Sequence, residues 1–346
     1  MKKFLAVMLA VVLAALTLAG CGSAGKESTP AASDSSNPLG LKEKIVIKYS
    51  HVQSTTSATH RAMEDFGKYI DEQSGGWVKL EIYPAGQLYN DSTEIDAIVG
   101  GNIDMVSTYM SKLTSVDTAA QYCLAPYLFD NVDEMEAFYT SEYAAPLFEN
   151  ISKLGLKVVN VMFGGEQYFM SRGDSVASVD GFNGKKVREG GGDMTKALYG
   201  ELGASVTTVA FNELYSAMQT GLVDIAVTSI DSAVSIQLQE TLKSVSHYKI
   251  QYAPYLLMFN QNKWNSFPEN VQKIIEDGLE IARKKQLEYT DEGCSKAIET
   301  VKGVCEFYEA TDEDIAALKA RWTPIVEKYV PASWFEAIAN FRAAKK

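Results

Sequence analysis

Arg188 and the glycines that follow it form the part of the sequence best suited to bind an anion. Arg188 ends a predicted strand, and Glu189, three glycines and Asp193 lead directly into a predicted helix. Glycine lets a backbone approach a ligand closely, and the first turn of a helix offers unpaired N–H groups to an anion. A guanidinium can meet a carboxylate with two parallel hydrogen bonds, a geometry that lysine cannot match. A surface arginine beside a flexible loop is the alternative interpretation.

Catalytic chemistry finds little support in the residue types. The three histidines, His51, His60 and His247, have no His-Glu-x-x-His spacing, and no Gly-x-Ser-x-Gly elbow occurs. Asp224 and Asp231 have no partner base or metal cluster nearby in sequence, and the glycine run lacks the Lys-Ser/Thr of a phosphate-binding loop. We therefore expect neither enzyme activity nor a metal or cofactor.

The cysteines point to no framework. Apart from Cys21, the chain has Cys123, Cys294 and Cys305, an odd number without Cys-x-x-Cys spacing, so neither a disulfide scaffold nor a zinc site is indicated. Cys294 and Cys305 could pair, although a predicted helix-to-strand turn near Gly303 would offset them. A buried small hydrophobic residue suits Cys123 best.

The first forty residues indicate export and anchoring. Lys2 and Lys3 precede an apolar run from Phe4 to Ala19, which is too short to span a membrane. It ends in Leu-Ala-Gly-Cys21, which resembles a bacterial lipobox, so we expect residues 1–20 to be a lipoprotein signal peptide and Cys21 to be diacylated. An ordinary secretory signal or a short membrane anchor is the alternative. Residues 21–40 have almost nothing to bury and are typical of a flexible tether.

The remaining chain is long and acidic. Its roughly 300 residues exceed what one core usually organises, so two lobes are expected. The formal charge is -12, with 44 acidic against 32 basic residues. This balance argues against a nucleic-acid partner, because phosphate contacts need clustered Lys and Arg.

Strand and helix patterns alternate after the tether. Strands are predicted at 45–51, 78–83 and 105–110, and helices at 60–71 and about 92–99. This order predicts parallel βαβ units and an α/β fold.

A short segment of the sequence has a counterpart 120 residues later. Residues 94–106 match residues 214–226, with Ala97, Gly101 and Asp104 aligned to Ala217, Gly221 and Asp224. Each copy predicts a helix closed by glycine and a loop into a buried strand. The match suggests two lobes built on the same unit, with a cleft between them that suits a small molecule.

The later chain predicts long helices. Ser266-Phe-Pro-Glu269 has the pattern of a capping box and would open a helix to about Val301, long enough to lie across both lobes. The run from Thr311 to Asp314 predicts the start of another helix.

Three residues of the first lobe lie at predicted strand ends or loops that would face the cleft: His51, Gln87 and Tyr109. Tyr109 joins an aromatic body to a polar tip, so it can stack and hydrogen-bond together. A structural or peripheral role is the alternative for each of the three.

Two longer motifs carry a family resemblance. Tyr83-Pro-Ala-Gly-Gln-Leu88 and the run from Phe211 to Asp224 resemble signatures of TRAP-type (tripartite ATP-independent periplasmic) solute-binding proteins, of the dicarboxylate-binding-protein-like kind. The order of Ser74-Gly-Gly76, Ala125–Phe129, Gly184–Arg188 and Leu202–Ala204 also fits, and the likeness covers about residues 44–300.

The resemblance implies a two-lobed periplasmic-binding-protein (flytrap) fold with a long helix bridging the lobes. In these terms we expect a first α/β lobe at 41–163 plus about 250–267, a second at 164–249, a bridging helix at 268–302, and a C-terminal strand and helices at 303–346. The resemblance also implies delivery of the ligand to a membrane permease driven by an ion gradient.

The resemblance further assigns site residues. Arg188 falls on the arginine that grips the ligand carboxylate in this family, and Phe211 on an aromatic beside the ligand, although core packing would also explain an aromatic there. Gln167 and Thr228 stand where the family often has a second arginine and an asparagine. Because both replacements are neutral, we expect a ligand with one carboxylate and a neutral or aromatic remainder.

The sequence therefore predicts an extracytoplasmic, lipid-anchored protein that binds a small carboxylate-bearing acid for a TRAP-type permease. The alternatives are the binding protein of an ATP-driven importer, a sensory receptor that presents its ligand to a membrane kinase, and an extracytoplasmic hydrolase.

Overall fold

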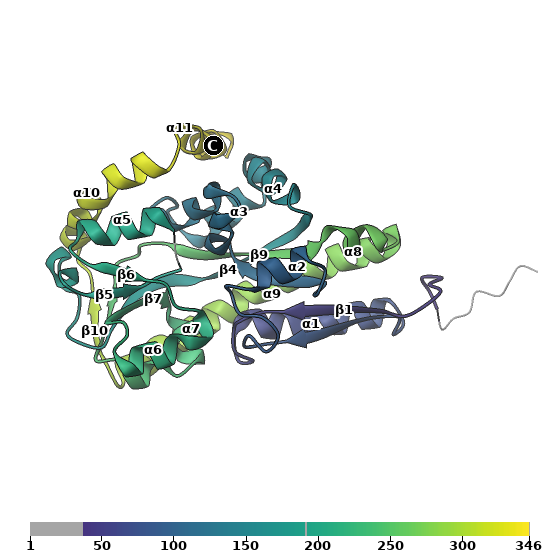
Figure 1. Ribbon diagram of the computed structural model, residues 1–346, viewed down its shortest axis with the longest axis horizontal. Helices are drawn as coiled ribbons and strands as arrows, with labels where there is room; N and C mark the ends of the chain where they lie inside the picture. The colour runs from purple at the N-terminus through teal and green to yellow at the C-terminus, as the bar shows by residue number, and fades with distance from the viewer. Residues whose placement is uncertain (1–36, 191, 346) are drawn as a thin grey trace, which may run out of the picture. The chain divides into compact units, whose positions relative to one another are not determined.

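The computed structural model describes residues 37–190 and 192–345. The predicted signal peptide, Cys21 and most of the predicted tether lie outside the described residues. Strands and helices alternate along the chain, which confirms the α/β class (Figure 1). The strands are β1 Ile45–Ser50, β2 Val78–Tyr83, β3 Met105–Tyr109, β4 Leu156–Ser171, β5 Lys186–Arg188, β6 Ser205–Thr207, β7 Ile225–Ser229, β8 Ser244–His247, β9 Tyr252–Asn260 and β10 Glu306–Glu309.

Helices lie between and after these strands. The α-helices are α1 Ala58–Gln73, α2 Glu94–Val99, α3 Val132–Tyr139, α4 Ala145–Ser152, α5 Asp193–Glu201, α6 Leu214–Thr220, α7 Ile230–Ser235, α8 Gln261–Ser266, α9 Glu269–Lys302, α10 Asp312–Tyr329 and α11 Ala332–Ala344. The 3₁₀ turns are η1 Met110–Ser115, η2 Thr118–Leu124, η3 Glu142–Ala144, η4 Val179–Phe182, η5 Phe211–Glu213 and η6 Leu238–Thr241.

The strands form two sheets that share β4. The first sheet has the order β2-β1-β3-β9-β4, and the second has the order β6-β5-β7-β4-β8-β10. In both sheets three parallel strands stand in the sequence order second, first, third, and an antiparallel strand follows them. The two sheets therefore have the same topology at their parallel edges.

Strand β4 passes from one sheet to the other at a bulge. It pairs with β9 from Leu156 to Glu166 and with β7 from Gln167 onward, with an irregularity between Gly164 and Glu166. A Cβ on Gly165 would lie 2.7 Å from the Cys294 sulfur of α9. Only glycine fits where the crossing strand meets this helix, so the crossing and α9 pack in direct contact.

His247 ties this crossing to the edge of the second sheet. Its Nε2 lies 2.7 Å from Glu166 Oε2 and its Nδ1 lies 2.9 Å from Glu309 Oε1. The ring stacks on Tyr168 with centroids 4.3 Å apart. Burial alone would lower the pKa of His247, but the two carboxylates outweigh it and raise the pKa. The His247 ring therefore links β4, β8 and β10.

The internal match seen in the sequence corresponds to matching hydrogen bonds. Asp104 Oδ2 accepts the backbone N–H of Lys48, and Asp224 Oδ2 accepts that of Lys186, both at 2.8 Å. Gly101 and Gly221 both have positive φ, +74° and +78°. The same turn and the same carboxylate therefore hold the central strands β1 and β5 in the two sheets.

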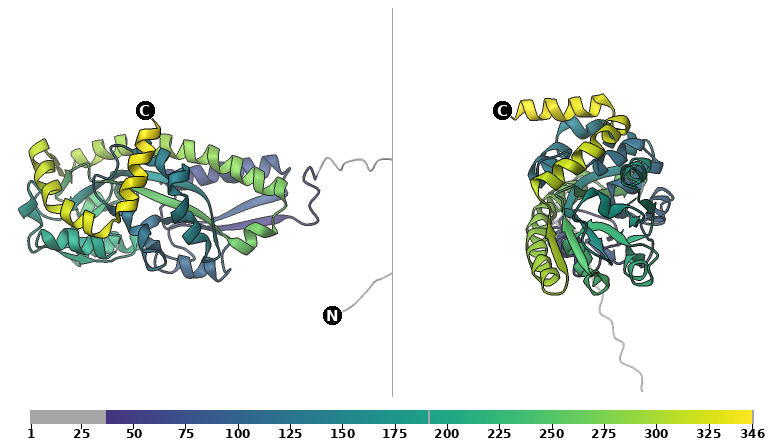
Figure 2. Two further views of the ribbon diagram at one scale, coloured as in Figure 1. Left: turned by 90° about the horizontal axis from the view of Figure 1, so that it is seen from above. Right: turned by 90° about the vertical axis from the view of Figure 1, so that its left-hand side faces the viewer.

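Helix α9 packs against α1, β4 and α7, and so contacts both sheets (Figure 2). The predicted capping box at its start is wrong, because Ser266 is the last residue of α8 and its hydroxyl donates to the Lys263 carbonyl at 2.7 Å. The N-cap of α9 is Pro268, without a side-chain cap. The start predicted at Thr311 is confirmed, with a complete capping box to Asp314.

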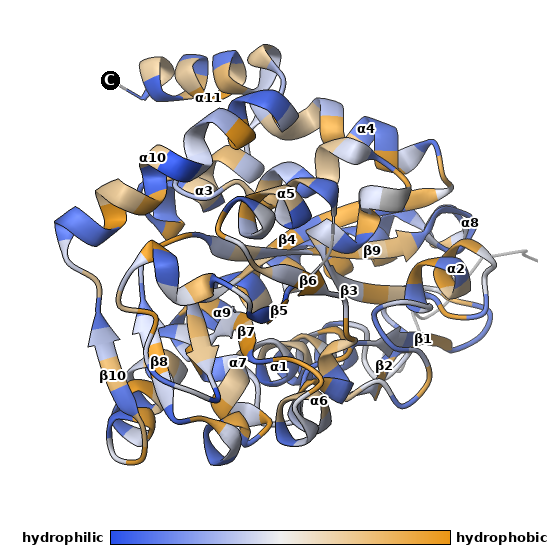
Figure 3. Ribbon diagram, turned by 60° about the vertical axis from the view of Figure 1, so that its left-hand side comes forward, coloured by the Kyte–Doolittle hydropathy of each residue, from blue (hydrophilic) through white to orange (hydrophobic). Residues whose placement is uncertain are grey.

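The interior is apolar and the cysteines within it are free. Figure 3 shows that the helices carry both apolar and polar residues around their turns, as expected where one face packs on a sheet. Helix α10 packs on α5, where the Trp322 indole donates to the Leu198 carbonyl at 2.9 Å. Cys123, Cys294 and Cys305 form no disulfide.

Glu94 anchors the first turn of α2 to β3 in an unusual way. Its side chain is fully buried, and one oxygen accepts the Thr108 hydroxyl at 2.8 Å. Burial raises the pKa of Glu94 to about 8, and the charge of Asp91 adds to this effect, whereas Thr108 and Lys112 oppose it. The carboxyl is therefore mostly protonated at neutral pH.

Glu94→Gln should stabilise the protein at pH 8 much more than at pH 5. Between the ordinary pKa near 4.5 and the folded value of about 8, the unfolded chain loses a proton that the fold retains. Wild-type stability then falls as pH rises, by up to ~1.4 kcal/mol per pH unit, and the glutamine variant lacks this loss. Urea unfolding across this pH range measures the effect. Glu288→Gln, on the exposed face of α9, is the control, and a pH-independent difference for Glu94→Gln would contradict the assignment.

Candidate ligand-binding site

A small cavity gathers five of the seven residues predicted to bind ligand. Its volume is about 30 Å³, and among those residues it is lined by Arg188, Gln167, Phe211, Thr228 and Tyr109. Four of these residues lie on strands of the two sheets, whereas Phe211 lies in η5. Tyr109 and Arg188 are the last residues of β3 and β5. The cavity therefore lies at the carboxyl ends of parallel strands, where open α/β sheets bind ligands.

The Arg188 guanidinium is held in place by hydrogen bonds from one of its edges to the backbone. Its Nε and Nη2 donate to the Val209 carbonyl at 3.1 and 2.8 Å, and the residue is 5% exposed. These bonds use the side edge of the guanidinium and leave the end edge, between Nη1 and Nη2, to meet an acid. Within residues 37–190 and 192–345 the guanidinium forms no ion pair. A buried cation of this kind is stabilised by an anion that can reach it.

Gly190 serves close packing more than open anion binding. A Cβ on Gly190 would lie 2.9 Å from Ser111 Oγ of η1 and 3.0 Å from Tyr109 Cε1 of β3, so the Gly190 backbone packs closely against both residues. The expectation of unpaired N–H groups at the start of α5 is wrong at Met194, because its N–H donates to Gln121 Oε1 at 3.2 Å. The Gln121 side chain of η2 therefore occupies the position at the start of α5 where the sequence predicted a bound anion.

The neutral polar residues stand beside the arginine. Gln167 and Thr228 are both buried, and Gln167 Nε2 donates weakly to the Gly165 carbonyl at 3.4 Å. Phe211 packs against the apolar core of the second sheet and also lines the cavity. Their contact with a ligand remains a prediction.

His51 and Gln87 do not line the cavity. His51 is fully buried, with its Nε2 3.1 Å from His60 Nδ1, and burial together with the charge of His60 lowers its pKa to about 3. It is therefore neutral at physiological pH. Gln87 is exposed in its loop.

The sequence did not reveal several lining residues. The cavity is also lined by Val52, Gln53, Asp91, Lys112, Gly190, Val227, Ala253 and Tyr255. The rings of Tyr109 and Tyr255 lie 5.4 Å apart and form an aromatic wall. Tyr255 belongs to β9, which returns from far along the chain, so no local pattern could place it here.

Asp91 and Lys112 form a buried ion pair that also lines the cavity. Lys112 Nζ lies 3.1 Å from Asp91 Oδ2, and their side chains are 9% and 5% exposed respectively. The signals in the sequence were slight: Lys112 follows Tyr109 by three residues, and Asp91 follows the loop after β2. The cavity thus has a second cation, already matched by a carboxylate.

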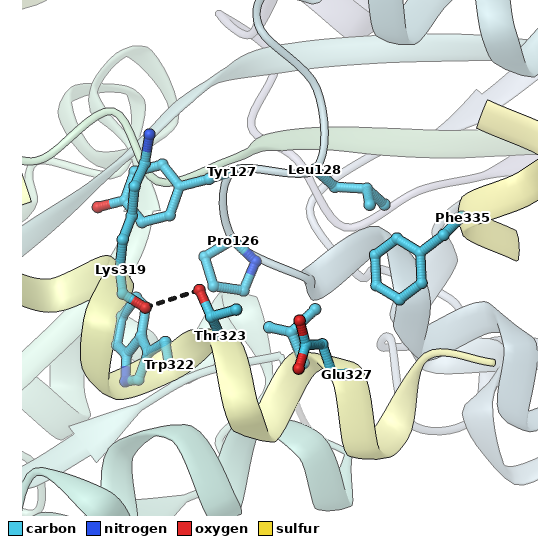
Figure 4. A pocket seen from close by; sticks show the side chains of 9 residues that line it. Pro126, Tyr127, Leu128, Lys319, Trp322, Thr323, Glu327 and Phe335 are labelled. Atoms are coloured by element: carbon cyan, nitrogen blue, oxygen red, sulfur yellow. Dashed lines mark hydrogen bonds between the residues drawn. The ribbon is translucent and has the colours of Figure 1, made fainter. Parts of the chain in front are cut away.

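A larger groove lies against α10. It has a volume of about 340 Å³ and is lined mainly by apolar and aromatic side chains from residues 126–128, α10 and Phe335 (Figure 4). Lys319 Nζ lies 4.6 Å from the centre of the Tyr127 ring, and the Thr323 hydroxyl donates to the Lys319 carbonyl at 2.8 Å. This groove is larger, but the smaller cavity contains the buried Arg188 guanidinium, which can bind an anion. We therefore take the smaller cavity as the candidate ligand-binding site.

Two other features are absent from the described part of the chain. No group of three or more His, Cys, Asp and Glu side chains there is placed to hold a metal ion. No helix among these residues has the length and apolar character needed to cross a membrane.

Comparison with known proteins supports the interpretation of the motifs. The C4-dicarboxylate-binding periplasmic protein DctP of Rhodobacter capsulatus is 28% identical over 312 residues, which cover 88% of this chain and 92% of that protein. The C4-dicarboxylate-binding protein DctB of Bacillus subtilis is 23% identical over 312 residues, 89% of this chain and 88% of that protein.

Solved structures share the fold. A TRAP periplasmic solute-binding protein from Shewanella oneidensis with bound succinate matches with a TM-score of 0.82 at 18% identity, over 86% of this chain and 99% of that one. The sugar acid binding protein DctPAm from Advenella mimigardefordensis, in complex with galactonate, matches with a TM-score of 0.84 at 17% identity, over 88% and 99%. The predicted two-lobed fold is thereby confirmed.

The family model described as bacterial extracellular solute-binding protein, family 7, matches residues 49–332, most of the chain. The identification of the motifs as those of a TRAP-type solute-binding protein is confirmed, and this chain belongs to that family.

Proposed function

We propose that this protein captures a small organic acid outside the cytoplasm and delivers it to a TRAP permease driven by an ion gradient. The observation that carries the proposal is the buried Arg188 guanidinium, which has no ion pair among the described residues and whose end edge remains for an acid. A carboxylate supplies the opposite charge and two acceptors in the matching geometry. The names of the relatives, and the succinate and galactonate in the similar structures, support an organic acid.

The acid in this proposal has a single carboxylate. Gln167 and Thr228 offer neutral hydrogen-bonding groups, and Tyr109 and Phe211 offer aromatic surface. The second cation, Lys112, is 3.1 Å from the Asp91 carboxylate, so a second carboxylate would meet little net positive charge.

Capture in this proposal proceeds by closure of two lobes around the acid. The cavity volume of about 30 Å³ accommodates roughly two water molecules, so an organic acid can enter only if the walls move apart. We place the lobes at 41–163 plus about 250–267 and at 164–249, since β4 changes sheets within residues 164–167. A ligand that contacts both walls favours the closed state by its differential affinity.

Arg188→Lys should weaken acid binding by at least tenfold while leaving the fold intact. Lysine keeps the charge but cannot hold the Val209 carbonyl and a carboxylate together with a planar fork. Isothermal titration calorimetry measures the change in dissociation constant, with the organic acid that most raises the unfolding midpoint of the wild-type protein. Arg321→Lys, in an exposed pair with Glu201, is the matched control. Binding retained within threefold by Arg188→Lys and Arg188→Ala alike would reject the carboxylate clamp.

The acid itself is found by a thermal-shift screen of mono- and dicarboxylates, aromatic acids, sugar acids, amino acids and neutral sugars. An acid at a hundred times its dissociation constant adds ~2.7 kcal/mol of stability, which raises the unfolding midpoint clearly. Shifts with neutral sugars alone would overturn the proposal.

We also propose that the protein is anchored by lipid at Cys21, as its sequence context indicates. Two acyl chains give stable attachment because each buried methylene contributes ~0.8 kcal/mol. Cys21→Ser should therefore move the protein from the membrane fraction to the soluble extracytoplasmic fraction, as seen by immunoblotting. Cys305→Ser should leave it in the membrane fraction, and an unchanged distribution for Cys21→Ser would refute the anchor.

A further inference from the structure

The Asp91–Lys112 pair presents an unsatisfied acceptor at the cavity. Asp91 Oδ2 lies 3.1 Å from Lys112 Nζ, whereas Oδ1 is buried and has no hydrogen-bond partner among the described residues. Both residues line the cavity that Arg188 also lines. Buried polar atoms are nearly always hydrogen-bonded in native proteins, so this oxygen calls for a donor from a ligand or from water.

Other polar atoms nearby narrow what that donor can be. The Tyr109 hydroxyl is also buried without a partner in the described part of the chain, and it can donate or accept. Gln53, which also lines the cavity, has its Oε1 buried without a partner in the same part of the chain, and an amide oxygen can only accept. Behind the pair, Glu94 has a pKa of about 8 because of burial, so it adds little negative charge at neutral pH. The pair is therefore close to neutral overall, with one free acceptor and an ammonium that retains donors.

A hydroxyl group matches this arrangement better than any charged group. It can donate to Asp91 Oδ1 and accept from Lys112 Nζ without adding charge. A second carboxylate would be attracted by Lys112 but would lie beside the Asp91 carboxylate, and an ammonium would lie beside Lys112. In a buried site either charge would be left partly uncompensated, which is costly.

We infer that Asp91 and Lys112 read a hydroxyl group on the bound acid, so that the ligand is a hydroxylated monocarboxylate of the hydroxy-acid or sugar-acid class. This inference rests on the proposed function, in which Arg188 binds the carboxylate of the same molecule. Asp91 and Lys112 then select the hydroxyl group, and Arg188 selects the carboxylate.

Matched acids test the inference on the wild-type protein. Titration calorimetry at pH 7 compares 3-hydroxybutyrate with butyrate, gluconate with hexanoate, and malate with succinate. In at least one of the two monocarboxylate pairs the hydroxylated acid should bind at least tenfold more tightly and should also bind more tightly than succinate. If acids bind but the hydroxylated and unhydroxylated members agree within threefold, or succinate binds tightest, the inference is overturned while the proposed function stands. If no acid binds, the proposed function itself fails.

The Asp91→Asn variant tests the role of the pair. It removes the negative charge and leaves Lys112 unpaired, so the preference for the hydroxylated acid should fall at least fivefold and succinate should bind more tightly than to the wild type. Asp277→Asn, in an exposed pair with Lys273, is the control and should change neither. An unchanged preference in a folded Asp91→Asn protein would overturn the inference. If Asp91→Asn does not fold, the wild-type comparison decides.

Discussion

The two sheets share a single strand, and the arrangement of the binding site depends on that sharing. Strand β4 leaves β9 and joins β7 at a bulge where Gly165 lies against Cys294 of α9. Gln167 is the first residue after the change of sheet and lines the cavity. Because the backbone itself crosses here, separation of the two sheets' sides of the cavity requires bending of β4 and of α9, which packs along it. The hydrogen bonds of His247 with Glu166 and Glu309 hold the second sheet's side of this crossing.

The two walls begin from the same scaffold and end in different chemistry. Asp104 and Asp224 hold the equivalent backbone positions of β1 and β5, so Ser50 and Arg188 occupy matching strand ends two residues later. On the second sheet this position has a buried cation that needs an anion. On the first sheet's side of the cavity, Asp91 and Lys112 form an ion pair whose net charge is close to zero. A repeated framework thus positions both walls, and the side chains at the strand ends decide what each wall can recognise.

Local patterns in the sequence predicted the elements well, because periodicity and glycine placement report on backbone geometry. Strand β2 and the glycines at 101 and 221 are examples, and the family motifs placed Arg188, Gln167 and Thr228 at one cavity. Two errors arose where a neighbouring element took a group for itself. The Ser266 hydroxyl bonds within α8 instead of capping α9, and Gln121 of η2 caps Met194. Neither neighbour can be inferred from the local pattern at those positions.

Lys112 and Asp91 show most clearly what the sequence could not convey. Each is an ordinary charged residue near a turn, and 20 residues of chain separate them before the first sheet folds. Folding buries both and leaves one Asp91 oxygen without a partner among the described residues. Gln167 stands where the family often has a second arginine, so the sequence predicts a neutral pocket. The net charge is indeed close to zero there, but Asp91 and Lys112 contribute two opposite charges. A neutral amide and a neutral ion pair differ in what they bind, because the pair presents a strong acceptor beside a strong donor and so favours a group that is both.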